Sequence, residues 1–313
     1  YTLFYEPEKC FRDLLRGLEV VSIAQGESRK EAPSTNYLDR IFRIRRDTAV
    51  AKKLAMLIKP DTEILNPHDA FCFKVAYFFK KYVSDVPSVW TMHDMPTRYF
   101  GYLRASALNP NLKFPVFKRI LYLLLDRIQV LRYIKIQDAV VVLDKRDLEW
   151  VKKFFKKDAE IVRNGLNPNS FSYKPRQTPN NNSVRLLMNG IFFEHRRFED
   201  GLQAVKILSS KGYEARVTIV GAYKEGDAYY KRLKKLVGNL KLLDKVNFRG
   251  AVGEEELKSS YQDHDIFLFP NHFQSWGLAV FEAMASGMPV VVSKSAGASE
   301  VLSDNQNVLL IDP

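Results

Sequence analysis

Short apolar runs alternate with amphipathic segments along the second half of the chain. Runs typical of strands lie at residues 184–193, 215–220, 246–250, 266–269, 290–292 and 308–311. Helical patterns lie between them at residues 199–210, 229–240 and 254–263. Because the runs are nearly continuous in Val, Ile, Leu and Phe, they fit a parallel sheet that helices cover on both faces. The pattern predicts a doubly wound α/β domain.

The first half keeps the same alternation with less regularity. Strand-like runs lie at residues 18–23, 62–65, 88–92 and 139–143, and helical patterns at 38–58, 71–83 and 114–136. Residues 167–183 are rich in Pro, Asn and Ser and carry little apolar periodicity, which is typical of a linker. We therefore predict an N-terminal domain over residues 1–172 and a C-terminal domain over residues 173–313.

Composition restricts the class of protein. Hydrophobic residues make up 46% and charged residues 27% of the chain, which excludes a disordered or multispanning protein. Cys10 and Cys72 show no spacing typical of a disulfide framework or a zinc site, so a reducing cytoplasm fits best. The sequence opens at Tyr1 without a Met, a signal peptide or a glycine-rich first turn. We expect a piece of the N-terminal domain and a C-terminal helix to be missing from it.

The net charge of +12 lies mostly in the first half. Residues 1–172 hold 30 Lys+Arg against 20 Asp+Glu, and residues 113–135 alone hold six basic residues and one acidic residue, Asp126. Apolar residues are interleaved with them: Ile120, Leu121, Leu124, Ile128 and Leu131. One hypothesis is a basic amphipathic helix at the inner face of an anionic membrane, joined by residues 152–157. The alternative is that the apolar residues face the domain core. No nucleic-acid motif is present, so nucleic acid is not an expected partner.

One carboxylate stands out in the apolar segment from residue 266 to 292. Glu282 is its only formally charged side chain when His272 is neutral, and a buried carboxylate must be hydrogen-bonded. A helix beginning near Gly277 would offer its first N–H groups, those of Trp276, Gly277 and Leu278, to a phosphate. Glu282 could then accept hydrogen bonds from ribose hydroxyls. The alternative is a packed helix start with Glu282 bonded to a backbone amide.

Three segments resemble a known family. Residues 248–292, "FRGAVGEEELKSSYQDHDIFLFPNHFQSWGLAVFEAMASGMPVVV", resemble the donor-binding signature of glycosyltransferase family 4. Residues 162–171, "VRNGLNPNSF", are similar to its interdomain hinge, and residues 91–96, "TMHDMP", to its acceptor-side histidine motif. The resemblance implies the GT-B architecture, in which two Rossmann-like α/β domains face each other across a cleft.

The resemblance also implies a reaction. Such an enzyme transfers a hexose, with retention of configuration, from a UDP-, GDP- or dTDP-linked sugar to a saccharide or lipid-linked acceptor, in polysaccharide or glycoconjugate biosynthesis. The nucleotide sugar is a substrate, and no cofactor or metal is expected. The sequence contains no Asp-x-Asp cation motif, which agrees with a metal-independent reaction.

The chain departs from the family pattern at two places. The family has two glutamates eight positions apart, of which Glu282 matches the second, while Gln274 replaces the first. A glutamine keeps the acceptor oxygen, gains a donor and loses the charge. Ile191 replaces the usual arginine after Gly190, and we assign the pyrophosphate-binding lysine position to Arg197. For Arg196 we favour a solvated ion pair with a nearby carboxylate.

The resemblance completes the set of candidate site residues. His93 follows a predicted strand end, and the family implies that it contacts donor or acceptor hydroxyls without acting as a general base; His68 is a weaker candidate. The predicted catalytic residues are His93, Arg197 and Gln274. The predicted donor-binding residues are Gly190, Arg196, Val252, Ser275, Trp276, Gly277, Leu278 and Glu282.

Two other functions stay open. A glycosyltransferase-like module that binds nucleotide sugars with impaired turnover would explain Gln274 and Ile191. A nucleotide-sugar epimerase on the same fold would need acid and base carboxylates in the cleft, and the sequence identifies none.

Overall fold

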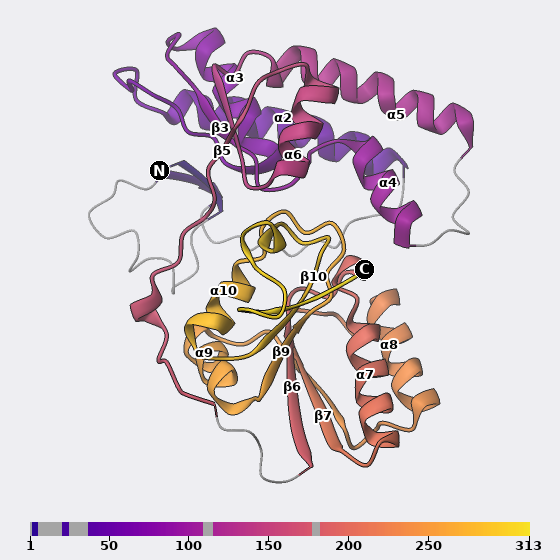
Figure 1. The fold of residues 1–313 in the computed structure, drawn as a ribbon. Helices are drawn as coiled ribbons and strands as arrows, with labels where there is room; N and C mark the ends of the chain where they lie inside the picture. The colour runs from indigo at the N-terminus through magenta and orange to yellow at the C-terminus, as the bar shows by residue number, and fades with distance from the viewer. Residues whose placement is uncertain (1, 6–20, 25–36, 109–114, 177–181) are drawn as a thin grey trace. The chain divides into compact units, whose positions relative to one another are not determined.

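The computed structural model describes residues 2–5, 21–24, 37–108, 115–176 and 182–313 (Figure 1). The chain divides into two compact units, one formed by residues 1–103 and 113–162 and the other by residues 104–112 and 163–313. The predicted boundary at residue 172 lies later in the chain than this division.

The second unit is built on a six-stranded, fully parallel sheet. Its strands are β6 (Ser183–Asn189), β7 (Glu214–Val220), β8 (Val246–Gly250), β9 (Ile266–Phe269), β10 (Val290–Ser293) and β11 (Leu309–Ile311). They lie in the order β11-β10-β9-β6-β7-β8, which is the order of a Rossmann sheet. The direction of winding reverses between β6 and β9, and ligands bind such sheets where this reversal occurs.

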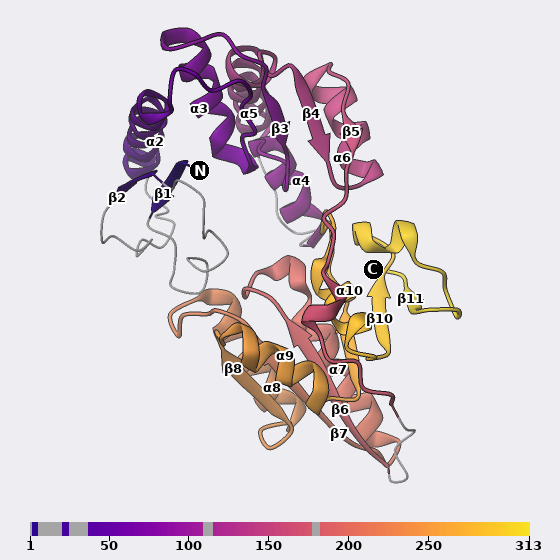
Figure 2. The same ribbon diagram turned by 90° about the vertical axis from the view of Figure 1, so that its left-hand side faces the viewer.

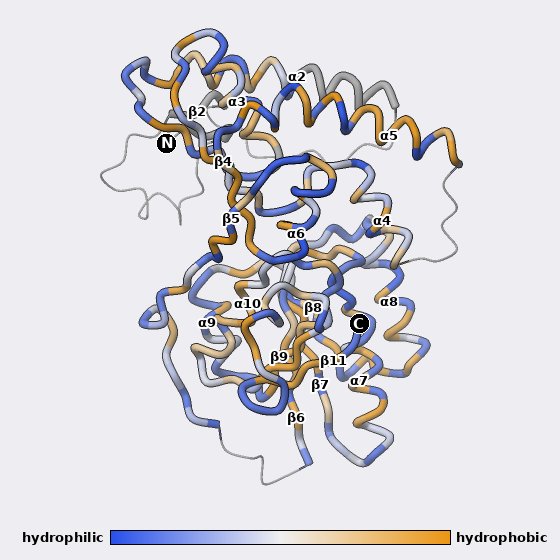
Figure 3. The backbone as a smooth tube through the Cα atoms, turned by 45° about the horizontal axis from the view of Figure 1, so that its top comes forward, coloured by the Kyte–Doolittle hydropathy of each residue, from blue (hydrophilic) through white to orange (hydrophobic). Residues whose placement is uncertain are grey.

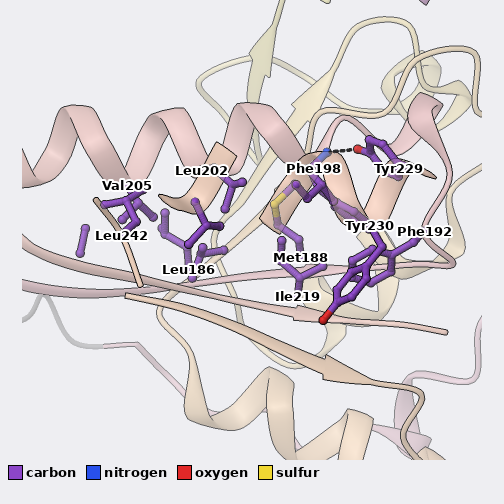
Figure 4. Packing of buried hydrophobic residues seen from close by; sticks show 14 residues of the cluster. Leu186, Met188, Phe192, Phe198, Leu202, Val205, Ile219, Tyr229, Tyr230 and Leu242 are labelled. Atoms are coloured by element: carbon purple, nitrogen blue, oxygen red, sulfur yellow. Dashed lines mark hydrogen bonds between the residues drawn. The ribbon is translucent and has the colours of Figure 1, made fainter. Parts of the chain in front are cut away.

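Helices cover both faces of this sheet (Figures 1 and 2). They are α7 (Phe198–Ser210), α8 (Ala228–Leu240), α9 (Glu254–Asp263) and α10 (Leu278–Ala285). Side chains alternate along β6, so Leu186 and Met188 pack with α7 and α8, whereas Leu187 packs on the opposite face with Val280 of α10. Figure 4 shows the first of these cores, in which Phe198 at the start of α7 lies beside Met188. Burial on both faces confirms the predicted doubly wound domain.

The first unit has a smaller parallel sheet of β3 (Val89–Thr91), β4 (Ala139–Val142) and β5 (Glu160–Ile161). A separate parallel pair joins β1 (Thr2–Tyr5) and β2 (Val21–Ala24). Its helices are α2 (Tyr37–Leu57), α3 (Asp69–Tyr82), α5 (Val116–Gln129) and α6 (Lys145–Trp150), and it also contains the first residues of α4 (Arg98–Leu108), which the division between the units crosses. Short π-helical segments extend α5 as Val130–Ile134 and α6 as Val151–Phe155.

The structure corrects several predicted elements. The strand expected over residues 184–193 ends at Asn189, because Gly190 takes a positive φ of 137° and a 3-10 turn follows at Glu194–Arg196. Residues 62–65 form no described strand, only the single bridge from Leu65 to Ser88. The helices α4 and α6 were not predicted.

The segment predicted as a linker is bound to the second unit over its described part. Nη1 of Arg176 donates to the carbonyl oxygens of Gln262 and His264, at 2.9 Å each. The backbone N–H of Lys174 donates to the carbonyl of Ser286 at 3.4 Å. Residues 172–176 therefore belong to the C-terminal unit rather than to a free connection.

The helix predicted over residues 114–136 is α5 with its π-helical extension, but the interpretation that its apolar residues face the core is wrong. Ile120, Leu124 and Ile128 are exposed by 53%, 56% and 58%, whereas Asp126 is exposed by 6%. The hydropathy-coloured tube in Figure 3 shows the apolar residues recurring along α5. The apolar stripe of this helix therefore faces away from the rest of its own unit.

Candidate functional site

Two loops meet where the winding of the second sheet reverses. One follows β6 and begins at Gly190, and the other follows β9 and contains Asn271 and Gln274. The loop after β7 closes in beside the first: a Cβ atom on Gly221 would lie 1.9 Å from the carbonyl oxygen of Gly190. Only glycine at position 221, where φ is 156°, allows this approach.

Glu282 is held here by a hydrogen bond from Tyr261, whose hydroxyl is in turn held by Asn189. The hydroxyl of Tyr261 in α9 donates to Oε2 of Glu282 at 2.7 Å, and Nδ2 of Asn189, at the end of β6, donates to the hydroxyl of Tyr261 at 2.7 Å. Burial raises the pKa of Glu282, and the hydrogen bond from Tyr261 opposes that rise. The need for a hydrogen-bonding partner is thus met by a tyrosine and not by a backbone amide. Oε1 of Glu282 has no partner among the described residues and can accept from a ligand.

The first turn of α10 lies next to Glu282. Gly277 precedes the helix with φ of 91°, and a Cβ atom there would lie 2.8 Å from the ring of Phe269. Within the described part of the chain, no acceptor pairs with the backbone N–H groups of Trp276, Gly277 or Leu278. These three groups form the positive end of the helix and can bind an anion.

The side chain of Trp276 fixes the start of α10 to the segment that resembles the family hinge. Its indole Nε1 donates to the carbonyl of Asn164 at 3.0 Å, and the guanidinium of Arg163 lies 5.5 Å from its ring centroid. Arg163 is itself paired with Glu300 at 2.7 Å. The indole therefore packs within the second unit, and the carbonyl of Trp276 accepts from the N–H of Ala298 at 2.8 Å.

Arg196 brings the two loops together. Its Nη1 donates to Oε1 of Gln274 at 2.9 Å, and its guanidinium covers Gly190 so closely that a Cβ atom there would lie 2.8 Å from Nε. With the amide of Asn271 turned so that its oxygen faces the arginine, Nη1 also donates to Asn271 at 2.8 Å. The cation of Arg196, for which the sequence favoured a solvated ion pair, thus bonds to the amides of Gln274 and Asn271 between the loops after β6 and β9.

Arg197 occupies the ion-paired position instead. It takes a left-handed backbone conformation, with φ of 55°, just before α7. Its guanidinium then follows the first turn of the helix, where it bonds to both carboxylate oxygens of Asp200, at 2.9 and 2.8 Å, and lies 3.9 Å from Glu199. Arg197 therefore forms the ion pair with the first turn of α7, while Arg196 bonds to the amide of Gln274.

The other predicted donor-site residues lie around these loops. Ser275 is buried, Leu278 is the first residue of α10, and Val252 packs against the core beside that helix. Ile191, which replaces the family arginine, is exposed by 51% and puts no charge at the site. Tyr261, Asn189 and Asn271 were not predicted, since only the sheet topology brings Tyr261 and Asn189 to Glu282 and Asn271 to Arg196.

His93 belongs to the first unit and is paired with His68. Nδ1 of His68 lies 2.9 Å from Nε2 of His93, and the two rings stack with centroids 5.2 Å apart. Burial, and secondly the neighbouring His93, lower the pKa of His68. His68 forms a parallel β-bridge with Thr91, the last residue of β3, and His93 lies two residues after Thr91. The arrangement keeps one imidazole hydrogen-bonded to the other and fixes the ring of His93.

The described residues hold neither a candidate metal site nor a membrane-spanning helix. They contain no cluster of three or more His, Cys, Asp and Glu side chains that could hold a metal ion. No helix among them is both long and apolar enough to cross a membrane.

Known proteins are similar to this chain in sequence. Residues 170–313 match the family model of glycosyl transferases group 1. The chain is 31% identical over 116 residues to mannosylfructose-phosphate synthase of Agrobacterium fabrum, which covers 36% of this chain and 26% of that enzyme. It is 32% identical over 109 residues to sulfoquinovosyl transferase SQD2 of Arabidopsis thaliana, which covers 34% of this chain and 20% of that protein. The matched stretch thus spans about a quarter of the length of these relatives.

Solved structures share the fold of the whole chain. Anabaena Alr3699/HepE, crystallised with UDP and glucose, superposes with a TM-score of 0.69 at 16% identity, over 100% of this chain and 77% of that one. The sucrose-phosphate synthase of Thermosynechococcus elongatus gives 0.68 at 16% identity, over 93% and 70%. Residues 170–313 of the chain therefore belong to the group 1 glycosyl transferases, and the chain has the GT-B fold of two Rossmann-like α/β units.

Proposed function

We propose that the protein is a retaining glycosyltransferase that moves a hexose from a nucleotide sugar to a saccharide or lipid-linked acceptor, in polysaccharide or glycoconjugate biosynthesis. The observation that carries this proposal is the chain of hydrogen bonds from Asn189 through Tyr261 to Glu282, beside the open start of α10. Neighbouring folds bound to UDP and UDP-glucose, such as Anabaena Alr3699/HepE, support the nucleotide part of the donor.

The donor's charged part fits the positive end of α10. Its diphosphate would accept hydrogen bonds from the N–H groups of Gly277 and Leu278, where the helix dipole favours an anion. The ribose hydroxyls would donate to Oε1 of Glu282, while Tyr261 fixes the other carboxylate oxygen. Glu282 therefore has one oxygen held by the protein and one available to the ligand.

Arg196 is the cation that we assign to the leaving group. The amide oxygen of Gln274 accepts from Nη1 of Arg196 at 2.9 Å and so orients the guanidinium beside Gly190. An arginine fork can bind two phosphate oxygens at once. It would stabilise the charge that develops on the nucleoside diphosphate as the glycosidic bond breaks. Arg197, whose charge is paired with Asp200, contributes little to this step.

We assign no general acid or base of the protein to the transfer step. Transfer would occur on the front side of the sugar, with the donor phosphate accepting the acceptor's proton and without a protein nucleophile or a metal ion. His93 would contact donor or acceptor hydroxyls, since its ring is already held by His68. Activity unchanged by EDTA would agree with this mechanism, and loss of activity restored by a divalent cation would contradict it.

A second candidate function is a nucleotide-sugar-binding module with impaired turnover. The observations that favour it are the neutral Gln274 and the uncharged Ile191, which remove two charges from the site that the resemblance leads one to expect. Binding depends on Glu282 and α10 in both cases, so only turnover separates the two functions.

The experiment that tests the proposal is an assay of nucleotide release. The protein is incubated with UDP-, GDP- and dTDP-sugars, with and without saccharide acceptors, and the released nucleotide is measured. Release that depends on one donor and rises with an acceptor supports the transferase, and NMR of the product's anomeric proton tests retention. Binding of a donor without release across the panel would favour the impaired module, and no binding at all would contradict both functions.

A further inference from the structure

Helix α5 carries an apolar stripe that faces away from the rest of its unit. We define the outward stripe as Phe117, Ile120, Leu121, Leu124, Ile128 and Leu131, whose exposed fractions lie between 42% and 70%. Their spacing of three and four residues places them on one side of the helix. A row of large aliphatic and aromatic side chains exposed together is unusual on a soluble surface and marks an interaction site.

The opposite side of α5 fixes this orientation. Asp126 is buried, and its carboxylate accepts hydrogen bonds from the backbone N–H groups of Arg98, at 3.1 Å, and Tyr99, at 2.9 Å. The guanidinium of Arg98 pairs with the same carboxylate at 2.9 Å. Further along, the amide of Gln129 donates to the carbonyl of Pro96 at 3.0 Å. Rotating α5 to bury its stripe would break these contacts and leave Asp126 without its partners.

Positive charge surrounds the outward stripe. Between residues 115 and 137 the basic side chains are Lys118, Arg119, Arg127, Arg132 and Lys135, and Asp126 is the only acidic one. That single carboxylate is buried and paired with Arg98, so it does not offset the exposed charge. Among the described residues, Arg127, Arg132 and Lys135 take part in no salt bridge. The surface therefore offers an apolar strip with a basic border.

We propose that the outward stripe of α5 docks on the surface of an anionic lipid bilayer. In a membrane-surface helix the apolar side chains enter the boundary between headgroups and acyl chains while lysines and arginines contact anionic headgroups. From Phe117 to Leu131 the helix rises by roughly 20 Å, too short to span the hydrocarbon core, so it lies parallel to the surface.

The charge border distinguishes a bilayer from a second copy of the chain. In a symmetric dimer through this face, the same surface of each copy would meet the other, and the two basic borders would repel. An anionic surface neutralises them instead. The docking goes beyond the transfer reaction and does not depend on it, although it would bring a lipid-linked acceptor to the enzyme.

The test is flotation of the purified protein with vesicles of phosphatidylcholine containing phosphatidylglycerol and with vesicles of phosphatidylcholine alone. We expect binding to the anionic vesicles that weakens as salt is added, and binding to neutral vesicles that is about tenfold weaker. The double variant Leu124→Asp/Ile128→Asp should lose at least about tenfold in binding. Its control is Leu243→Asp, because Leu243 is 80% exposed in the second unit and should not contact lipid.

A second pair of variants tests the basic border. Arg127→Ser/Lys135→Ser should bind anionic vesicles more weakly, while Lys231→Ser/Lys235→Ser, which removes the same charge from α8, should bind like the parent. The folding of each variant is checked by circular dichroism and by its affinity for UDP. Unchanged UDP affinity with lost vesicle binding separates this proposal from the proposed function.

Insertion of the helix can be measured directly. In the variant Leu124→Trp, brominated acyl chains in anionic vesicles should quench the fluorescence of the new indole more strongly than that of the native tryptophans. The proposal is overturned if the parent does not float with anionic vesicles, if the aspartate variants float equally well, or if the parent is a dimer without vesicles that Leu124→Asp dissociates.

Discussion

The hydroxyl of Tyr261 should stabilise the second unit in a pH-dependent way. The change Tyr261→Phe removes only this oxygen, because the ring is fully buried and packs edge-on against Phe267 with centroids 5.8 Å apart. It takes the donor away from Glu282 and the acceptor away from Asn189, both at 2.7 Å. The packing of the core stays as it is, so the effect reports on the hydrogen bonds.

The magnitude follows from the two lost contacts. A hydrogen bond to a charged group contributes about 1.5–3 kcal/mol, and a neutral one about 1 kcal/mol. When Glu282 is ionised, Tyr261→Phe should therefore cost about 2.5–4 kcal/mol of unfolding free energy in the second unit. When Glu282 is protonated, both lost hydrogen bonds are neutral, and the cost should fall to about 2 kcal/mol.

The direction of the pH dependence can be worked out from the burial of Glu282. Burial raises its pKa above the ordinary value of 4.5, so folding favours the protonated form. The stability gained in this way is fully present below the pKa of the unfolded chain and is lost as the pH rises through the folded-state pKa. Tyr261 opposes that loss by stabilising the carboxylate. Its removal must therefore cost more in mildly alkaline solution than in acid.

The assay is urea unfolding in mildly alkaline and in acidic solution. Hydrogen exchange of peptides from β6 and β9 then reports the stability of the second unit. Tyr213→Phe is the control, because Tyr213 is 41% exposed and its hydroxyl has no hydrogen bond within the described residues. An equal cost for Tyr261→Phe in acid and in alkali, or a cost no larger than that of the control, would refute the hydrogen-bonding chain.

Three further predictions concern the donor site. Gly277→Ala should destabilise the second unit by about 1–3 kcal/mol in urea unfolding and weaken UDP binding, because a Cβ atom meets the ring of Phe269 at a positive φ; full stability would contradict this. Arg196→Ala should reduce UDP affinity at least about tenfold in calorimetry, since it loses a charge-assisted bond to phosphate. Arg197→Ala should change the unfolding free energy by about 0–1 kcal/mol, because its ion pair with Asp200 is partly exposed, and should leave the UDP affinity nearly unchanged. A larger loss of UDP affinity in Arg197→Ala than in Arg196→Ala would support the assignment made from the sequence.

The sequence predicted the second unit far better than the first. Each of its strands lies in an apolar run, and α7, α8 and α9 lie in amphipathic segments, so β8, β9 and α9 have the predicted bounds. In the first unit α6 is six residues long and passes directly into a π-helix, too short for its period to be recognised. Periodicity identified α5 as amphipathic but carries no information on which side contacts the core.

The candidate site was predictable only where its residues are close in the sequence. Gly277 lies at the start of the helix that contains Glu282. Glu282 could be recognised in the sequence because it is the single carboxylate in an apolar segment. Tyr261 lies 21 residues before Glu282, and only the parallel sheet order brings them together. The ion pair of Arg197 with Asp200 was not predicted, because position along the chain does not reveal that Arg197 has a left-handed backbone just before α7.

The central claim is that Glu282 and the start of α10 bind the nucleotide of a sugar donor. The measurement that tests it most directly is calorimetric titration of UDP and GDP into the parent, Glu282→Ala and the control Glu255→Ala, whose carboxylate is exposed on α9. We predict that one of the two nucleotides binds the parent and the control equally, and binds Glu282→Ala at least about tenfold more weakly, because two ribose hydroxyls lose a charged acceptor. Equal affinity of the parent and Glu282→Ala, or no affinity of the parent for either nucleotide, would contradict the claim.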